Sequence, residues 1–111
     1  MSQATTSGRK DDLGKHELHL NPPEFLEGAA RAFMYGKGKY GEYNWMGGIK
    51  ASRLYDACQR HLLAWFWGEE TDPESGLSHL DHAAASLAML MGTLKRREDL
   101  DDRPNGPSNP S

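Results

Sequence analysis

The segment from residue 77 to residue 94 constrains the fold more than any other part of the sequence. Its apolar positions step by three and four residues: Leu77, Leu80, Ala84, Leu87, Met91 and Leu94. This heptad-like spacing is typical of a helix that packs lengthwise against other helices. Between residues 83 and 91 the segment is apolar nearly all round, which predicts burial on several sides. In a chain of 111 residues we expect part of that cover to come from another subunit. The sequence therefore predicts an all-α bundle that is completed by oligomerisation.

Two further stretches have helical spacing, and no stretch has the pattern of a strand. The first is expected to begin near Pro23, which suits a first helical turn, and to stop at Gly36. The second is expected between a capping Ser52 and a terminating Gly68. Asp72 is a good N-cap, so the third helix is expected to begin there.

The length and composition indicate one small domain. Residues 1–7 and the end of segment 95–111 are too polar to bury apolar surface. We therefore predict a disordered N-terminus, a folded domain over 8–94, and a fraying helix end with a disordered tail. The formal charge of −3 argues against general nucleic-acid binding, and no run approaches the ~18 apolar residues of a membrane span. Cys58 is the only cysteine, which excludes an internal disulfide and suits the reducing cytoplasm.

Candidate metal ligands gather between residues 60 and 84. His79 and His82 are three residues apart on one face of the expected third helix, and carboxylates precede that helix. The candidates are Glu69, Asp72, Glu74, His61, His79 and His82. Carboxylates suit Mg²⁺ or Mn²⁺, and imidazole shifts the preference towards Mn²⁺ or Zn²⁺.

Each candidate also has a structural interpretation. Asp72 before Pro73 is a good helix N-cap without any metal. Glu74 in a first turn favours the helix dipole. His61 lies on an apolar stripe, where a hydrogen-bonded core histidine is common, and the pair on the third helix can equally pack at an interface.

The stretch "MYGKGKYGEYNWMGG", residues 34–48, joins the first two expected helices. Its glycines allow close backbone approach to a ligand, its lysines supply positive charge, and its rings offer stacking faces. Together with two cations elsewhere, the predicted substrate-binding residues are Lys15, Lys37, Lys39, Tyr40, Asn44, Trp45 and Arg60. The pattern is not a Walker loop, and a mobile surface loop with aromatic anchors is the alternative.

Three blocks in this order resemble a known family: "GKYGEYNW" at 38–45, "RHLLAW" at 60–65 and "DPESGLSHLDHA" at 72–83. They resemble the phage dATP/dGTP diphosphohydrolases, a MazG-like group that includes the MazZ enzymes. The resemblance runs from about residue 8 to residue 94. It implies an all-α nucleotide pyrophosphohydrolase that forms dimers or tetramers, uses Mg²⁺ or Mn²⁺, and acts in the host cytoplasm if it is phage-encoded.

The implied reaction converts purine deoxynucleoside triphosphates, dGTP or dATP, to a monophosphate and pyrophosphate. In a phage it would supply dGMP for 2-aminoadenine synthesis. The wider superfamily carries ExxE on one helix and ExxD on the next. Here Glu24-x-x-Glu27 and Glu69-x-x-Asp72 match literally, but their separation is too long for that pattern. At the expected place on the third helix stand His79 and His82 instead. We predict Glu69, Asp72 and His79 as the catalytic residues.

Two other functions fit the same residues. One is a non-catalytic helical interaction module, in which the histidines pack and the loop binds a protein. The other is a metal phosphohydrolase that releases the nucleoside and triphosphate.

Overall fold

The computed structural model describes residues 8–107 and contains only helical elements over that range. The α-helices are α1 (Pro23–Tyr40), α2 (Ala51–Phe66) and α3 (His79–Arg96), and the short 3-10 helices are η1 (Leu18–Leu20), η2 (Asn44–Gly47) and η3 (Glu98–Leu100). Within the described residues one isolated antiparallel bridge, between Thr71 and Ser78, is the sole extended pairing. The all-α prediction is confirmed. The predicted disordered residues 1–7, and positions 108–111 of the tail, lie outside the described range.

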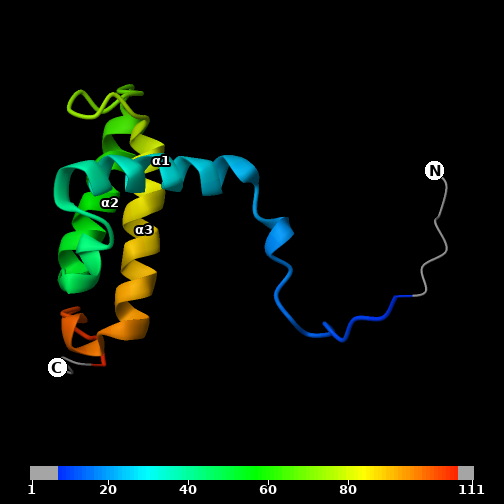
Figure 1. Ribbon diagram of the computed structural model, residues 1–111. Coiled ribbons are helices and arrows are strands. Elements are labelled where there is room, and N and C mark those ends of the chain that lie inside the picture. Colours follow the sequence, from blue (N-terminus) through cyan, green and yellow to red (C-terminus); the bar gives the residue numbers. More distant parts are fainter. Residues whose placement is uncertain (1–7, 108–111) are drawn as a thin grey trace, which may run out of the picture.

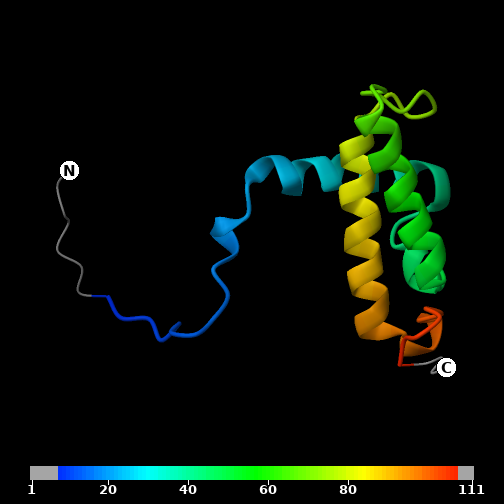
Figure 2. The same cartoon turned by 180° about the vertical axis from the view of Figure 1, so that it is seen from behind.

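Helices α2 and α3 lie side by side and antiparallel, and α1 crosses them near one end of the pair (Figure 1). The loop that connects α2 to α3 lies at that same end, and η3 lies at the opposite end (Figure 2). The start of α1 and the preceding segment project away from the helix pair. The molecule therefore has two distinct ends: one with the α2–α3 loop and one with the C-terminal segment.

The apolar core is built from small side chains. The buried apolar residues are Ala32, Ala51, Leu54, Ala83 and Ala85, and no large side chain in the described chain is fully buried. On α3 the heptad-like seam is not the packed face, because Leu80, Leu87 and Met91 are 42%, 42% and 66% exposed. The radius of gyration is 18.1 Å, whereas a compact domain of this length has about 13 Å. Cover from another subunit stays a prediction.

An ion pair fixes the crossing of α1 over α3. Arg31 donates to both carboxylate oxygens of the buried Asp81, at 2.8 and 3.1 Å. Gly28 lies one turn earlier on the same face of α1. A Cβ at Gly28 would stand 2.6 Å from Asp81 Oδ1. The glycine therefore lets α1 approach α3 closely enough for the pair to form.

The prediction that the first helix stops at Gly36 is wrong. Helix α1 continues for another turn to Tyr40 and ends at Gly41, which has φ 94°. A glycine costs a helix interior only about 1 kcal/mol, so Gly36 and Gly38 do not end it. Lys37 and Lys39 occupy the last turn, where cations favour the negative end of the helix dipole.

The third helix begins later than predicted, at His79, with Ser78 as its N-cap. The carboxylate of Asp72 accepts hydrogen bonds from the backbone N–H and the hydroxyl of Ser75, so it caps a turn and not the helix. Gly76 follows with φ 75°, a conformation that interrupts a helix. Predicted carboxylates therefore lie on a loop before α3.

The start of α2 differs from the expected capping by Ser52. Lys50 is the N-cap residue and its side chain makes no capping bond, while Ser52 lies inside the first turn. The carboxylate of Asp102 accepts from the Ser52 backbone N–H at 2.8 Å and from its hydroxyl. A residue from the C-terminal segment thus caps α2 across the fold. Gly68, with φ 105°, follows the end of α2 as expected.

No helix in the described part of the chain is both long enough and apolar enough to cross a membrane.

Candidate metal centre

Three histidines and an aspartate converge where the α2–α3 loop meets the two helices. His61 comes from the C-terminal half of α2, His79 and His82 come from the first turn of α3, and Asp72 comes from the loop. His61, Asp72 and His79 each place a ligand atom within 4.8 Å of the others. His82 stacks on His61 with ring centroids 4.7 Å apart. The fold therefore brings together most of the predicted metal ligands.

Hydrogen bonds define how His79 is held. Its Nε2 lies 2.7 Å from Glu69 Oε1, and its Nδ1 lies 2.8 Å from His61 Nδ1. An ionised carboxylate only accepts, so the Nε2–H of His79 donates to Glu69. In the neutral imidazole Nδ1 is then an acceptor, and His61 donates to it. This carboxylate–histidine arrangement is the one that orients metal-binding imidazoles in proteins.

Ser75 links Asp72 to His82. Its hydroxyl donates to Asp72 Oδ2 at 2.8 Å and accepts from the Leu77 N–H at 3.2 Å. His82 Nε2 lies 2.6 Å from the same hydroxyl oxygen. Because the only hydroxyl proton goes to Asp72, the Nε2–H of His82 must donate to Ser75. The Nδ1 of His82 is then left with its lone pair.

The electrostatics of the cluster favour an ionised Asp72 and a neutral His61. Burial opposes ionisation of Asp72, but the hydrogen bonds from Ser75 and the nearby His82 outweigh it and lower the pKa of the carboxyl. Burial, followed by the charges of His82 and His79, lowers the pKa of His61. A deprotonated carboxylate with neutral imidazoles is the form in which these groups bind a metal ion.

The donor set fits a divalent cation of the first transition row. His79 is 4% exposed, and His61 and Asp72 are half-buried, so the ligand atoms are shielded from competing water. Two imidazole nitrogens and one carboxylate favour Mn²⁺ or Zn²⁺ over Mg²⁺. Glu69 contacts the far side of His79, which makes it an orienting residue in this geometry.

The last turn of α1 brings two predicted substrate residues to the loop. Lys39 Nζ lies 2.6 Å from Glu74 Oε1, and this bond raises the pKa of Lys39 above its ordinary value. The same ammonium lies 5.2 Å from the centre of the Tyr40 ring. Glu74 is therefore paired with a cation and is not part of the histidine cluster.

Lys37 and Arg60 are exposed. Lys37 lies 3.7 Å from Glu42, and Arg60 immediately precedes His61 on α2. Both side chains are in contact with solvent. Burial is the main cause that lowers the pKa of His61, and the charge of Arg60 makes a smaller contribution in the same direction. Lys37 and Arg60 stay predicted substrate residues.

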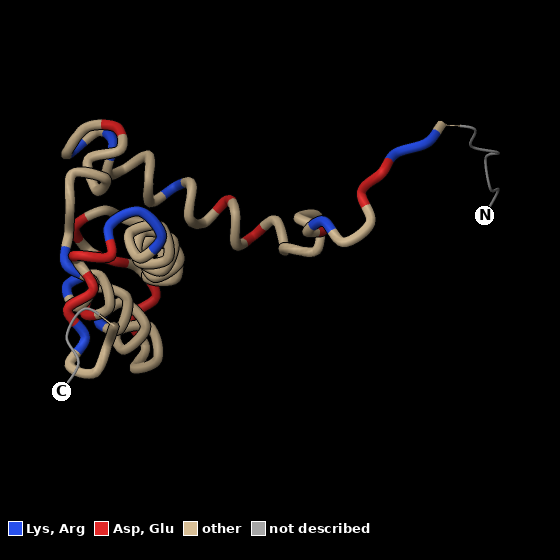
Figure 3. Tube along the Cα trace, turned by 90° about the horizontal axis from the view of Figure 1, so that it is seen from below, with Lys and Arg blue, Asp and Glu red and all other residues tan. Residues whose placement is uncertain are grey.

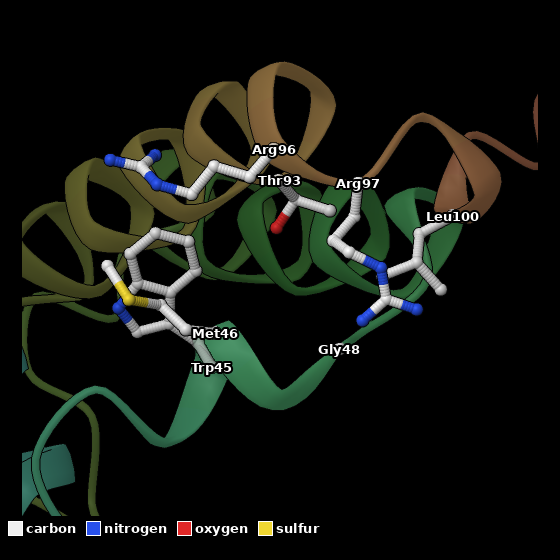
Figure 4. Close-up of a pocket in the computed structure, with 7 residues that line it drawn as sticks. All are labelled: Trp45, Met46, Gly48, Thr93, Arg96, Arg97 and Leu100. Carbon is white, nitrogen blue, oxygen red and sulfur yellow. The ribbon is translucent and has the colours of Figure 1, made fainter.

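Three predicted substrate residues are placed elsewhere. Trp45 lies in η2 with Asn44, and it packs near the C-terminal end of α3 together with Arg96, Arg97 and Leu100 (Figure 4). Gly92, which the Trp45 ring approaches, is 13 residues after His79, or about 20 Å along a helix at ~1.5 Å per residue. The cavity at Trp45 is about 10 Å³, room for one water and not for a base. Lys15 lies on the exposed N-terminal segment, away from the helix pair.

Two residues at the site were not anticipated. Ser75 bridges the loop to His82, and the Tyr35 ring meets His82 edge-on at 5.9 Å. The sequence carries a signal for the first, because Asp-x-x-Ser before glycine is typical of a turn closed by an aspartate side chain. For Tyr35 no signal existed, since the expected helix end at Gly36 gave no reason to place its ring against α3.

Comparisons with known proteins show the family to which the chain belongs. Residues 5–103 match the family described as dATP/dGTP diphosphohydrolase, N-terminal. A protein of Salmonella phage PMBT28, named dATP/dGTP diphosphohydrolase, is 42% identical over 97 residues, which cover 87% of this chain and 33% of the relative. The chain thus spans about a third of the length of the curated relative that it matches. No solved structure matches the chain. The chain belongs to the dATP/dGTP diphosphohydrolase N-terminal family.

Proposed function

We propose that this protein hydrolyses purine deoxynucleoside triphosphates, dGTP or dATP, to the monophosphate and pyrophosphate with a divalent cation. The observation that carries the proposal is the convergence of His61, Asp72 and His79, with ligand atoms within 4.8 Å of one another. Family membership supports the nucleotide as the substrate class, since the phage relative is named for dATP and dGTP.

His61, Asp72 and His79 would hold the cation, and the ring of His82 stacks on that of His61. When bound, a divalent cation at this place neutralises phosphate charge and lowers the pKa of a water molecule. Phosphoryl transfer depends mostly on such neutralisation and on an in-line approach of water. We infer Mn²⁺ as the better cofactor than Mg²⁺, because two of the three donors are imidazoles.

Around that position the chain's own groups orient and balance charge. Glu69 orients the ring of His79 by accepting from its Nε2–H. The hydroxyl of Ser75 bonds to both Asp72 and His82 and so fixes these two side chains relative to each other. The Glu69 side chain is 55% exposed, so its carboxylate can also exchange protons with solvent. The Nδ1 lone pair of His79 accepts from His61 in this structure, so a bound cation would replace that hydrogen bond.

The phosphate and base contacts come from the end of α1. Lys39 can exchange its exposed carboxylate partner Glu74 for a phosphate oxygen, and the adjacent Tyr40 is 61% exposed and offers a ring face. Lys37 and Arg60 supply further positive charge from the surface. Asn44 and Trp45 are left out of this proposal because of their distance from the cluster.

We also infer that the protein works as a homo-oligomer, a dimer or tetramer. The supporting observation is the small buried core together with an exposed apolar seam on α3. Burial of this seam in an interface would stabilise the oligomer by about 25 cal/mol for each Å² of apolar surface removed from water. A phage-encoded enzyme of this kind would act in the host cytoplasm and supply dGMP for 2-aminoadenine synthesis.

The test is incubation of the whole chain with each dNTP and Mn²⁺, followed by separation of the products. Monophosphate with pyrophosphate supports the proposal, and free nucleoside with triphosphate would assign the alternative cleavage. Asp72→Ala should abolish turnover. Asp56 is an exposed carboxylate on α2 outside the cluster, so Asp56→Ala should not reduce turnover. Absence of hydrolysis with every purine nucleotide would leave the non-catalytic interaction module.

A further inference from the structure

The surface between the three helices contains an apolar groove. It has a volume of about 380 Å³ and is lined by Phe25 of α1, by Cys58 and Leu62 of α2, and by Leu80, Ala84 and Leu87 of α3. An apolar cavity of about 150 Å³ accommodates one benzene-sized group, so this groove has room for about two large side chains. It is separate from the histidine cluster, none of whose residues lines it.

The segment before α1, residues 8–22, is here called the N-terminal arm. It carries Leu13, Leu18 and Leu20, which are 97%, 73% and 71% exposed. Every described residue from 8 to 27 is exposed, and the arm extends away from the helix pair (Figure 1). The η1 turn keeps Leu18 and Leu20 in a folded conformation without support from the bundle. Exposed leucines in such number on one short segment indicate a binding element.

The arm's charges do not explain its exposure. Figure 3 shows that basic residues 9 and 10 are followed directly by acidic residues 11 and 12, so the arm is not a uniformly basic or acidic tail. An electrostatic partner such as nucleic acid would require charge of one sign. Its leucines are thus the feature that a partner surface must match.

The N-terminal arm cannot easily reach the groove of its own chain. Pro22 and Pro23 stand at the start of α1, and a residue before proline is held extended. Pro22 has ψ 138°, an extended conformation, and the chain before it leads away from the helix pair (Figure 1). Folding back into the same groove needs a sharp reversal at the two positions where the backbone is most restricted. A second chain has no such restriction, and 14 residues from Gly8 to Asn21 span up to about 45 Å when extended.

We propose that the N-terminal arm of one copy seats Leu18 and Leu20 in the apolar groove of a second copy. The exchange is reciprocal in a two-fold dimer, so that both grooves are filled and the interface closes. It covers part of α3's exposed seam and Phe25 at the same time. This inference does not depend on the hydrolytic activity. It is also distinct from a homo-oligomer that forms through another surface without exchange of the arms.

The experiment uses the native thiol of Cys58, which lines the groove. In the whole chain, Leu18→Cys under mild oxidation should give a covalent dimer on non-reducing gels, and the dimer should be lost when Cys58→Ser is added. Lys95→Cys, an exposed position on the last turn of α3, is the matched control and should give none. In parallel, Leu18→Asp with Leu20→Asp should weaken dimerisation at least tenfold by sedimentation equilibrium.

Several results would overturn the exchange. A cross-link confined to a single chain would place the arm in its own groove. Oligomers of unchanged strength in the aspartate variant would assign the interface to the helices instead. If the wild type is a monomer at micromolar concentration and Leu18→Cys gives no cross-link, no second copy binds the arm.

Discussion

Substitution of Gly28 by alanine tests how α1 is held across α3. A Cβ at this position would lie 2.6 Å from Asp81 Oδ1 and 3.5 Å from its Cγ. Asp81 is 7% exposed, and both its oxygens bind Arg31. The carboxylate can move aside only by giving up that arrangement, and otherwise α1 must shift away from α3.

The magnitude follows from two opposing effects. Alanine in a helix interior is favoured over glycine by about 1 kcal/mol. Forcing an extra methyl group into a packed site costs about 1–3 kcal/mol, and a contact this short belongs in the upper half of that range. The expected net loss for Gly28→Ala is therefore about 1–2 kcal/mol of unfolding free energy. For a domain of this size that corresponds to roughly 5–15 °C in Tm.

Thermal and urea unfolding at a fixed protein concentration measure the effect, because association makes Tm depend on concentration. Gly36→Ala is the matched control: it lies in the same helix, and its added Cβ would meet nothing within 4 Å. We expect Gly36→Ala to stabilise by up to about 1 kcal/mol. If both variants gain stability alike, the crossing is not limited by contact with Asp81 and the reasoning fails.

Three further changes probe separate contacts. Glu69→Gln should weaken Mn²⁺ binding about 10–100-fold in isothermal titration without abolishing it, as expected for a residue that orients His79; complete loss would make Glu69 a direct ligand. Hydrogen bonds from Ser52 lower the pKa of Asp102, so its stabilisation is present above about pH 3.9 and lost as pH falls below that value. The Tm deficit of Asp102→Ala should accordingly shrink as pH falls below about 3.9, and a deficit that stays constant as pH is lowered would exclude this linkage. Gly92→Ala, whose Cβ would stand 2.8 Å from the Trp45 ring, should by the same reasoning lower stability by about 1–2 kcal/mol and leave Mn²⁺ affinity unchanged.

The helices were predictable because their periodicity is strong, and the misplaced ends share one physical cause. Gly36 and Gly76 are both glycines near expected helix boundaries, yet only Gly76 adopts a positive φ. Sequence does not distinguish a glycine tolerated inside a helix from one that interrupts it, since the difference depends on tertiary contacts. The late start of α3 follows from Gly76 and from the Asp72 side chain, which bonds to Ser75 instead of capping a helix.

The histidine cluster was predictable in its membership but not in its wiring. The spacing of His79 and His82 puts both on one face, and the short connection between helices brings His61 to them. Which carboxylate faces the imidazoles depends on the loop path, so Glu69 and Glu74 could not be ranked against Asp72 from sequence. Base contacts were the least predictable. Trp45 looked suited to stacking on a purine, but its ring packs against the far end of α3.

Binding of Mn²⁺ to the intact chain tests the central claim most directly, and electron paramagnetic resonance measures free against bound ion. We predict that the wild type binds the ion and that Asp56→Ala binds it equally well. At matched concentrations, Asp72→Ala and His79→Ala should each lose at least 90% of the bound Mn²⁺. Wild-type binding retained in both cluster variants, or no binding by the wild type itself, would contradict a metal centre formed by His61, Asp72 and His79.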